Sequence, residues 1–219
     1  MRIICSITSE IEEGKRENCL WTLQKINQKQ EIKLMTTSQI HLWTVAEYHQ
    51  MIDCGILTPE SRVELLEGRI IKMNRQPAPH AATTQRTSDY LKSQLIQQAH
   101  IRMQLPITLS NSEPEPDIAA VHIDPKAYGI SHPSPQEIFF LIEISDTTLR
   151  IDRQEKTLIY ARANIPEYWV LDVGDRQVYI YRHPTPKGYQ SETILSDSGI
   201  INPLNFPSVS LSLTEMFLP

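Results

Sequence analysis

The sequence predicts a mixed α/β fold of the α+β kind, in which helices flank a central mixed sheet. First, residues 138–144 form an apolar run dense enough for a central strand that is covered on both faces. Second, a helical stretch from about Asp152 to Ala163 follows that run directly. Third, short β-rich runs separated by Pro and Gly occur on both sides of it, which favours antiparallel neighbours. Together these observations predict one α+β layer architecture.

Composition sets wide bounds on the class of protein. The 219 residues carry a formal net charge of −5 and are 40% hydrophobic, as expected for a globular protein. No apolar stretch reaches the roughly 20 residues of a membrane span. The three scattered cysteines (Cys5, Cys19 and Cys54) argue against a disulfide framework and for a reducing compartment, so we expect a cytoplasmic protein without a membrane partner.

The domain organisation is predicted from where helix and strand signals begin. Residues 1–34 show weak periodicity and no capping pattern, which indicates an N-terminal extension that is poorly ordered. Residues 35–219 then form a single domain. It starts with a helix capped by Thr44 and Glu47 and a hairpin around Glu67 and Gly68. Further segments are a helix over about 80–99, strands at 100–105, 117–123, 138–144, 167–173, 176–181 and 188–195, and a short helix at 213–218.

Two carboxylates stand where strands begin or end. Glu143 interrupts the apolar run near its end, and a buried carboxylate is costly unless it is paired or binds a cation. Asp117 follows Pro116 and opens another apolar strand, although Pro-Asp is also common in turns. Two such acids can converge on Mg²⁺, which prefers oxygen ligands. The structural alternative for Glu143 is a hydrogen bond to an arginine.

Lys156 lies in the first turns of the helix after the Glu143 strand, and Tyr160 stands one turn further along the same face. A lysine at such a place is most often a solvated surface residue. Beside metal-bound carboxylates, its ammonium could hold the attacking water and offset negative charge on a reacting phosphate.

Several segments resemble one family. The strings E-P-E-P-D-I-A (113–119), L-I-E-I-S (141–145) and D-R-Q-E-K-T-L-I-Y-A-R-A-N-I-P-E-Y-W-V-L-D (152–172) are similar to the Uma-type "putative restriction endonucleases" of bacteria. That family belongs to the PD-(D/E)XK nuclease superfamily. Residues 44–51, 62–73 and 202–211 extend the resemblance to about 40–218. It implies a restriction-endonuclease-like core with an N-terminal helix and a β-hairpin.

The resemblance also assigns site residues. Asp117 and Glu143 match the family's two metal-binding acids, and Glu64 matches a third acid that completes the metal shell. The superfamily's lysine would fall at Ser145, and Lys156 matches a lysine that has moved to the next helix. His80 and Gln104 match polar cleft positions, which Ser145 and Tyr160 are expected to share.

The expected function is a Mg²⁺-dependent endonuclease, with Mn²⁺ as the other suitable ion, that hydrolyses phosphodiester bonds in double-stranded DNA. A homodimer is left open. The alternative is a catalytically inactive nuclease-fold protein that binds DNA or serves in assembly, which the acidic net charge keeps open. A glycosidase would use Asp117 and Glu143 without Lys156 and is the weaker alternative. Three crowded carboxylates should repel one another, so neutralising Glu143 is expected to leave the metal-free protein as stable as before or more so.

Overall fold

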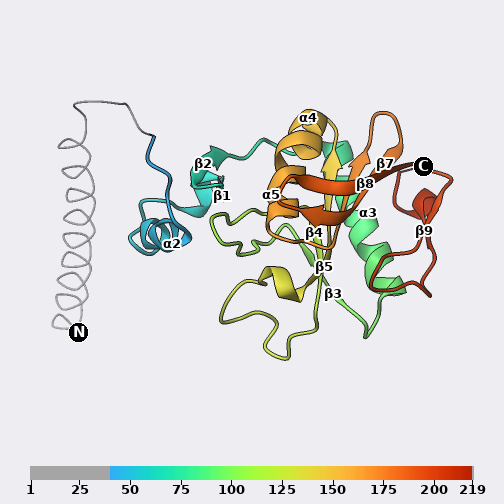
Figure 1. Cartoon of the computed structure of the whole chain (residues 1–219), viewed down its shortest axis with the longest axis horizontal. Coiled ribbons are helices and arrows are strands. Elements are labelled where there is room, and N and C mark those ends of the chain that lie inside the picture. Colours follow the sequence, from blue (N-terminus) through green and yellow to red (C-terminus); the bar gives the residue numbers. More distant parts are fainter. Residues whose placement is uncertain (1–39, 219) are drawn as a thin grey trace, which may run out of the picture. The chain divides into compact units, whose positions relative to one another are not determined.

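The structure, a computed structural model, describes residues 40–218 (Figure 1). The chain divides into two compact units, residues 1–73 and 74–219. The predicted boundary at residue 34 and the predicted extension lie outside the described residues. A single domain over 35–219 stays a prediction, and each unit is described here by itself.

The first unit contains the predicted N-terminal helix, α2 (Val45–Asp53). Thr44 caps it: the Glu47 N–H donates to the Thr44 hydroxyl at 3.2 Å, and the Glu47 carboxylate accepts from the Thr44 N–H at 2.9 Å. This reciprocal pair satisfies two backbone donors that the helix leaves open. A short turn of 3₁₀ helix, η1 (Pro59–Ser61), follows.

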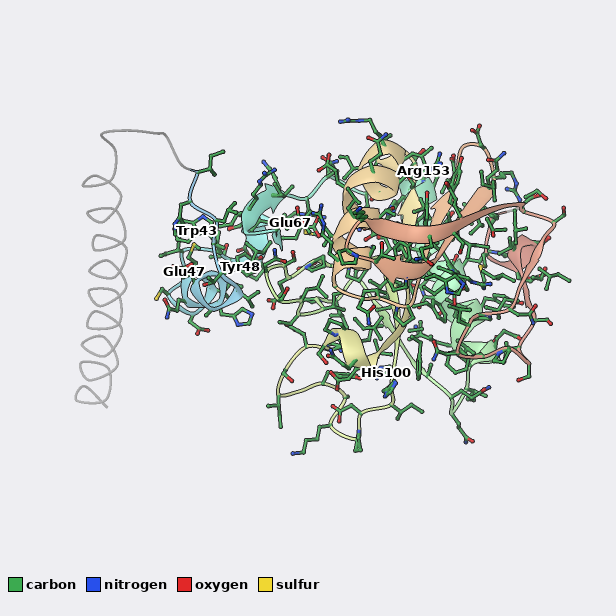
Figure 2. All side chains as sticks on the ribbon, viewed as in Figure 1. Trp43, Glu47, Tyr48, Glu67, His100 and Arg153 are labelled. Atoms are coloured by element: carbon green, nitrogen blue, oxygen red, sulfur yellow. The ribbon has the colours of Figure 1, made fainter. Side chains whose placement is uncertain are left out.

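The predicted hairpin is also present in this unit, as β1 (Val63–Leu66) and β2 (Arg69–Lys72). Glu67 and Gly68 both have positive φ, 45° and 76°, as the tight turn of a two-residue hairpin requires. A Cβ at Gly68 would lie 2.7 Å from that of Leu42, so only glycine fits there. The Trp43 N–H donates to the Gly68 carbonyl at 2.7 Å, and the Tyr48 hydroxyl donates to the carbonyl of Val63 (Figure 2).

The second unit is built on a six-stranded mixed sheet with the order β3-β4-β5-β6-β7-β8. Only β5 and β6 run parallel, and the helical segment between them makes the crossover that a parallel pair needs. The other neighbours are antiparallel. The strands are β3 (His100–Met103), β4 (Ile118–Val121), β5 (Ile138–Ser145), β6 (Glu167–Asp172), β7 (Gln177–Thr185) and β8 (Gly188–Ser196).

Different elements cover the two faces of this sheet (Figure 1). On one face, α3 (Ala78–Gln94) and the C-terminal segment pack onto alternate residues of β4 to β7 and form the main hydrophobic core. The C-terminal segment contains the short strands β9 (Ile200–Ile201) and β10 (Leu211–Ser212) and the turn η4 (Leu213–Glu215). Phe140 and Trp169 stack at 4.6 Å in this core, and both are fully buried.

The opposite face is covered by one helical segment in three parts: α4 (Leu149–Ile151), η3 (Asp152–Lys156) and α5 (Thr157–Arg162). The middle part, η3, is a π-helical turn, a feature that often occurs at functional sites. The Asp152 carbonyl accepts from the hydroxyls of Thr157 and Tyr168, at 2.9 and 3.1 Å. Side chains hold the widened turn in place, and both Asp152 and Lys156 are buried.

The structure confirms the predicted fold class and places Tyr168, Trp169, Tyr179 and Tyr181 in buried positions. It also describes elements that were not predicted: η1, η2 (Pro135–Glu137) and the β9–β10 pair. Within residues 40–218, no helix is long and apolar enough to cross a membrane.

Candidate functional site

Asp117 is the residue before β4 and joins three neighbouring elements. Its side chain accepts a hydrogen bond from the Ile144 N–H of β5 at 2.8 Å. Its carbonyl accepts from the Gln104 N–H at 3.0 Å, which extends the β3–β4 pairing by one residue. The β4–β5 register, extended in the same way beyond Ile118 and Ile142, sets Asp117 opposite Glu143 on one face of the sheet. Asp117 is buried, with 6% of the residue exposed.

Glu143 lies on the same face and binds the helical segment. Its Oε1 accepts from the Lys156 ammonium at 2.9 Å and from the Tyr160 hydroxyl at 2.8 Å. Glu143 and Tyr160 are nearly enclosed, and Lys156 is 9% exposed. The contacting partner is therefore a lysine from the next helix, rather than the arginine considered as the structural alternative. The structure brings together Glu143, Lys156 and Tyr160, three of the residues singled out in the sequence.

Asp152 is a further buried acid that the sequence analysis did not single out. Burial raises the pKa of its carboxyl, and the Asp117 charge adds to that increase, against the lowering by Lys156 and Thr148. The Thr148 hydroxyl donates to Asp152, and Ser145, fully buried at the end of β5, lies 3.4 Å from the same hydroxyl. Asp152 precedes Lys156 by four residues, and that helical spacing is the signal that could have identified it.

His80 and Gln104 approach Asp117 from two sides. The Nε2 of His80, near the start of α3, lies 3.1 Å from one carboxylate oxygen, and the Gln104 amide lies 3.5 Å from the other. Burial by itself lowers the pKa of His80. The hydrogen bond and charge of Asp117, with the charges of Asp152 and Asp146, outweigh it, so the net pKa of His80 is raised. Both predicted cleft residues therefore contact the predicted metal ligand.

Glu64, the predicted third metal ligand, belongs to the first unit. It is 6% exposed, lies on β1 and faces Ile71 of β2 in the hairpin register. Its participation in a site with Asp117 and Glu143 stays a prediction.

The carboxylates of the candidate site suit a hard cation. Asp117 and Glu143 offer carboxylate oxygens from neighbouring strands, and Asp152 adds negative charge nearby. Among residues 40–218, no three His, Cys, Asp or Glu side chains are already arranged as a metal cage. Mg²⁺ does not require such a cage, because it commonly takes one or two carboxylates and completes its octahedron with waters and substrate phosphate.

A separate hollow of about 390 Å³ opens where the helical segment meets β7 and β8. Arg153, labelled in Figure 2, packs over the Tyr179 ring at 3.8 Å and donates to the Tyr181 hydroxyl and to Glu192. Burial, with the charge of Glu192 added, raises the pKa of Tyr181 to about 12. The hollow is lined by Leu149, Arg150, Arg153, Gln154, Tyr181 and Glu192.

Comparison with known proteins identifies the fold and the family. No curated protein matches the chain. A solved structure, the crystal structure of a "putative nuclease" from Anabaena variabilis ATCC 29413, is similar to this one with a TM-score of 0.60 and 19% sequence identity. The match covers 80% of this chain and 97% of that one, and at this identity it shows the shared fold. The model of the Uma2 family, described as "Putative restriction endonuclease", matches residues 45–214. Since this match spans most of the chain, including Asp117, Glu143 and Lys156, the chain belongs to the Uma2 family.

Proposed function

We propose that this protein is a divalent-metal-dependent endonuclease that hydrolyses phosphodiester bonds in DNA. One observation carries the proposal: the buried contact at 2.9 Å between Glu143 and Lys156, with Asp117 fixed on the neighbouring strand. A lysine and two acids on one face of a sheet form the minimal set for metal-assisted phosphodiester hydrolysis. Membership of a family described as restriction endonucleases supports the same reaction.

Asp117 and Glu143 would hold the ion, Mg²⁺ or Mn²⁺. Each carboxylate has two oxygens with about four acceptor sites in all, so the hydrogen bonds observed at Asp117 and Glu143 are compatible with coordination. A bound ion would supply Lewis-acid activation of the phosphate and a template for the reacting groups. Glu64 is the proposed third acid of this set.

The chain's own residues would orient the reacting groups. Glu143, which also accepts from the Tyr160 hydroxyl, holds the Lys156 side chain, so its ammonium needs little reorganisation to donate to a water molecule and to a phosphate oxygen. The Ile144 N–H and His80 hold the Asp117 carboxylate in one orientation. Helix η3 and the buried Ser145 keep Asp152 close to Lys156.

Double-stranded DNA is the proposed partner, a homodimer is left open, and the proposed location is the cytoplasm. The acidic net charge of −5 means that a local site, rather than the overall charge, must attract the substrate. Metal and basic side chains at the site can supply that attraction.

The test is cleavage of end-labelled DNA duplex, single-stranded DNA and RNA with Mg²⁺, Mn²⁺ or chelator. Wild type is expected to cut DNA only with metal, and Asp117→Asn and Lys156→Met to lose at least 100-fold in rate. Asp117→Asn keeps an acceptor for the Ile144 N–H, so it changes the charge with little change in shape. The control is Asp89→Asn on the exposed side of α3. Cleavage that persists in chelator, or in Asp117→Asn, contradicts the mechanism. Binding without cleavage by wild type would favour the DNA-binding alternative.

A further inference from the structure

Arg102, on β3, is a buried cation that has no anionic partner among residues 40–218. Only 5% of this residue is exposed. Within the described residues no carboxylate pairs with the guanidinium, and Tyr128 is the group whose charge acts on it. Burial lowers the pKa of Arg102 from its ordinary value. Buried arginines are nearly always paired, because an uncompensated charge in the interior costs several kcal/mol.

The contacts that Arg102 does make are weak for a structural role. Its Nη2 donates to the Pro106 carbonyl at 3.4 Å, which is long for a hydrogen bond to a charged donor. The guanidinium carbon lies 5.2 Å from the centre of the Tyr128 ring. Its Nε is enclosed and has no hydrogen-bond partner in the part of the chain that the structure describes. The planar group is positioned by the ring while part of its donor capacity is unused.

The sheet register places Arg102 on the same face as the candidate site. Arg102 stands opposite Ala119, which stands opposite Leu141. Side chains two residues apart on a strand share a face. Asp117 is two residues from Ala119 and Glu143 is two from Leu141, so the row of Arg102, Ala119 and Leu141 lies beside the row of Asp117 and Glu143. The separation of one row from the next is about 7 Å along the strand. Successive phosphates of one DNA strand rise by about 3.4 Å along the helix axis and are further apart through space, so a cation one row away is at a distance that suits a neighbouring phosphate.

We propose that Arg102 binds a phosphate group of the substrate strand next to the bond that is cut. The inference rests on the proposed nuclease function and adds a residue that grips the substrate. A guanidinium presents a planar fork of N–H donors that matches phosphate oxygens, which a lysine does not. An anion bound there would also compensate the buried charge. Arg102 would thus position the backbone without taking part in the chemistry.

The experiment measures two quantities for wild type, Arg102→Gln, Arg102→Met and a matched control. The control, Arg86→Gln, removes an arginine of α3 that is already paired with Glu215. The first quantity is the rise in melting temperature on adding inorganic phosphate. The second is the affinity for a labelled DNA duplex, measured in chelator over a range of salt so that no cleavage takes place.

Phosphate should stabilise wild type and Arg86→Gln but not the Arg102 variants. Arg102→Gln should bind the duplex about tenfold more weakly, and its slope of log affinity against log salt should fall by about 0.9. Without phosphate, Arg102→Met should melt at or above the wild-type temperature, because it removes an unpaired buried charge.

Three results would overturn the proposal. One is a duplex affinity and salt slope equal to those of Arg86→Gln. Another is strong destabilisation or failure to fold of Arg102→Met, which would show a structural role. The third is phosphate stabilisation that depends on Arg102 while duplex binding does not. Failure of the nuclease function itself would appear differently, as duplex binding by wild type without cleavage once metal is added, or as no duplex binding by wild type at all.

Discussion

Neutralising Glu143 should destabilise the protein, because it removes the carboxylate that pairs with the buried ammonium of Lys156. Glu143 is 4% exposed and Lys156 9% exposed, with 2.9 Å between the charged atoms. Breaking such a buried pair by removing one partner costs roughly 3–5 kcal/mol. In a chain of this length, each kcal/mol lowers the melting temperature by about 2–4 °C. Glu143→Gln should therefore melt about 6–20 °C below wild type.

The double variant Glu143→Gln, Lys156→Met separates this effect from a general loss of packing. It removes both charges, and replacing a buried pair by neutral groups is often neutral or stabilising by about 1–4 kcal/mol. The double variant should recover most of the stability that either single variant loses, which a double-mutant cycle measures by calorimetry. The exposed pair of Arg86 and Glu215 is the control: Glu215→Gln should cost no more than about 1 kcal/mol.

This prediction reverses the expectation from sequence. Crowded carboxylates alone would make Glu143→Gln neutral or stabilising, whereas the structure pairs Glu143 with an ammonium. A Glu143→Gln protein as stable as Glu215→Gln, or a double variant no better than the singles, would refute the pairing argument.

Two further predictions concern stability in the absence of metal. The pKa of Asp152 is raised in the folded state. Its contribution to stability is therefore full below the unfolded-state pKa near 4 and is lost as the pH rises through the folded-state pKa. Asp152→Asn should exceed wild type in stability at neutral pH and lose that advantage near pH 4. A pH series of urea melts checks this, and an Asp152→Asn difference that grows as the pH falls would contradict it. A chain that starts at Met35 should melt within a few degrees of full length and keep its activity; a large fall in melting temperature would show that residues 1–34 belong to the folded core.

The strands and helices were largely predictable because their signals are local. The apolar density of β5, the capping pair of Thr44 and Glu47 and the turn at Gly68 each depend on neighbouring residues only. The short β9–β10 pair and the π-helical turn were missed. A two-residue strand has no period to detect, and the turn depends on the distant Tyr168 hydroxyl.

The site was predictable in its residue types but not in its contacts. Family resemblance placed weight on Lys156 although the usual position holds Ser145, and the structure shows Lys156 in contact with Glu143. Asp152 was missed although its four-residue spacing from Lys156 is a sequence signal. Arg102 was missed because a sequence does not show which face of a strand a polar residue takes. That depends on strand register, where a shift of one residue reverses every side chain.

The most direct test of the account is the position of Mn²⁺ in crystals of the protein, located by its anomalous scattering. We predict one strong peak within coordination distance of carboxylate oxygens of both Asp117 and Glu143, with the Lys156 ammonium beside it. The same crystals of Asp117→Asn should lack that peak. An ion bound elsewhere in a protein that cleaves DNA only with Mn²⁺, or a peak unchanged in Asp117→Asn, would contradict the proposed site.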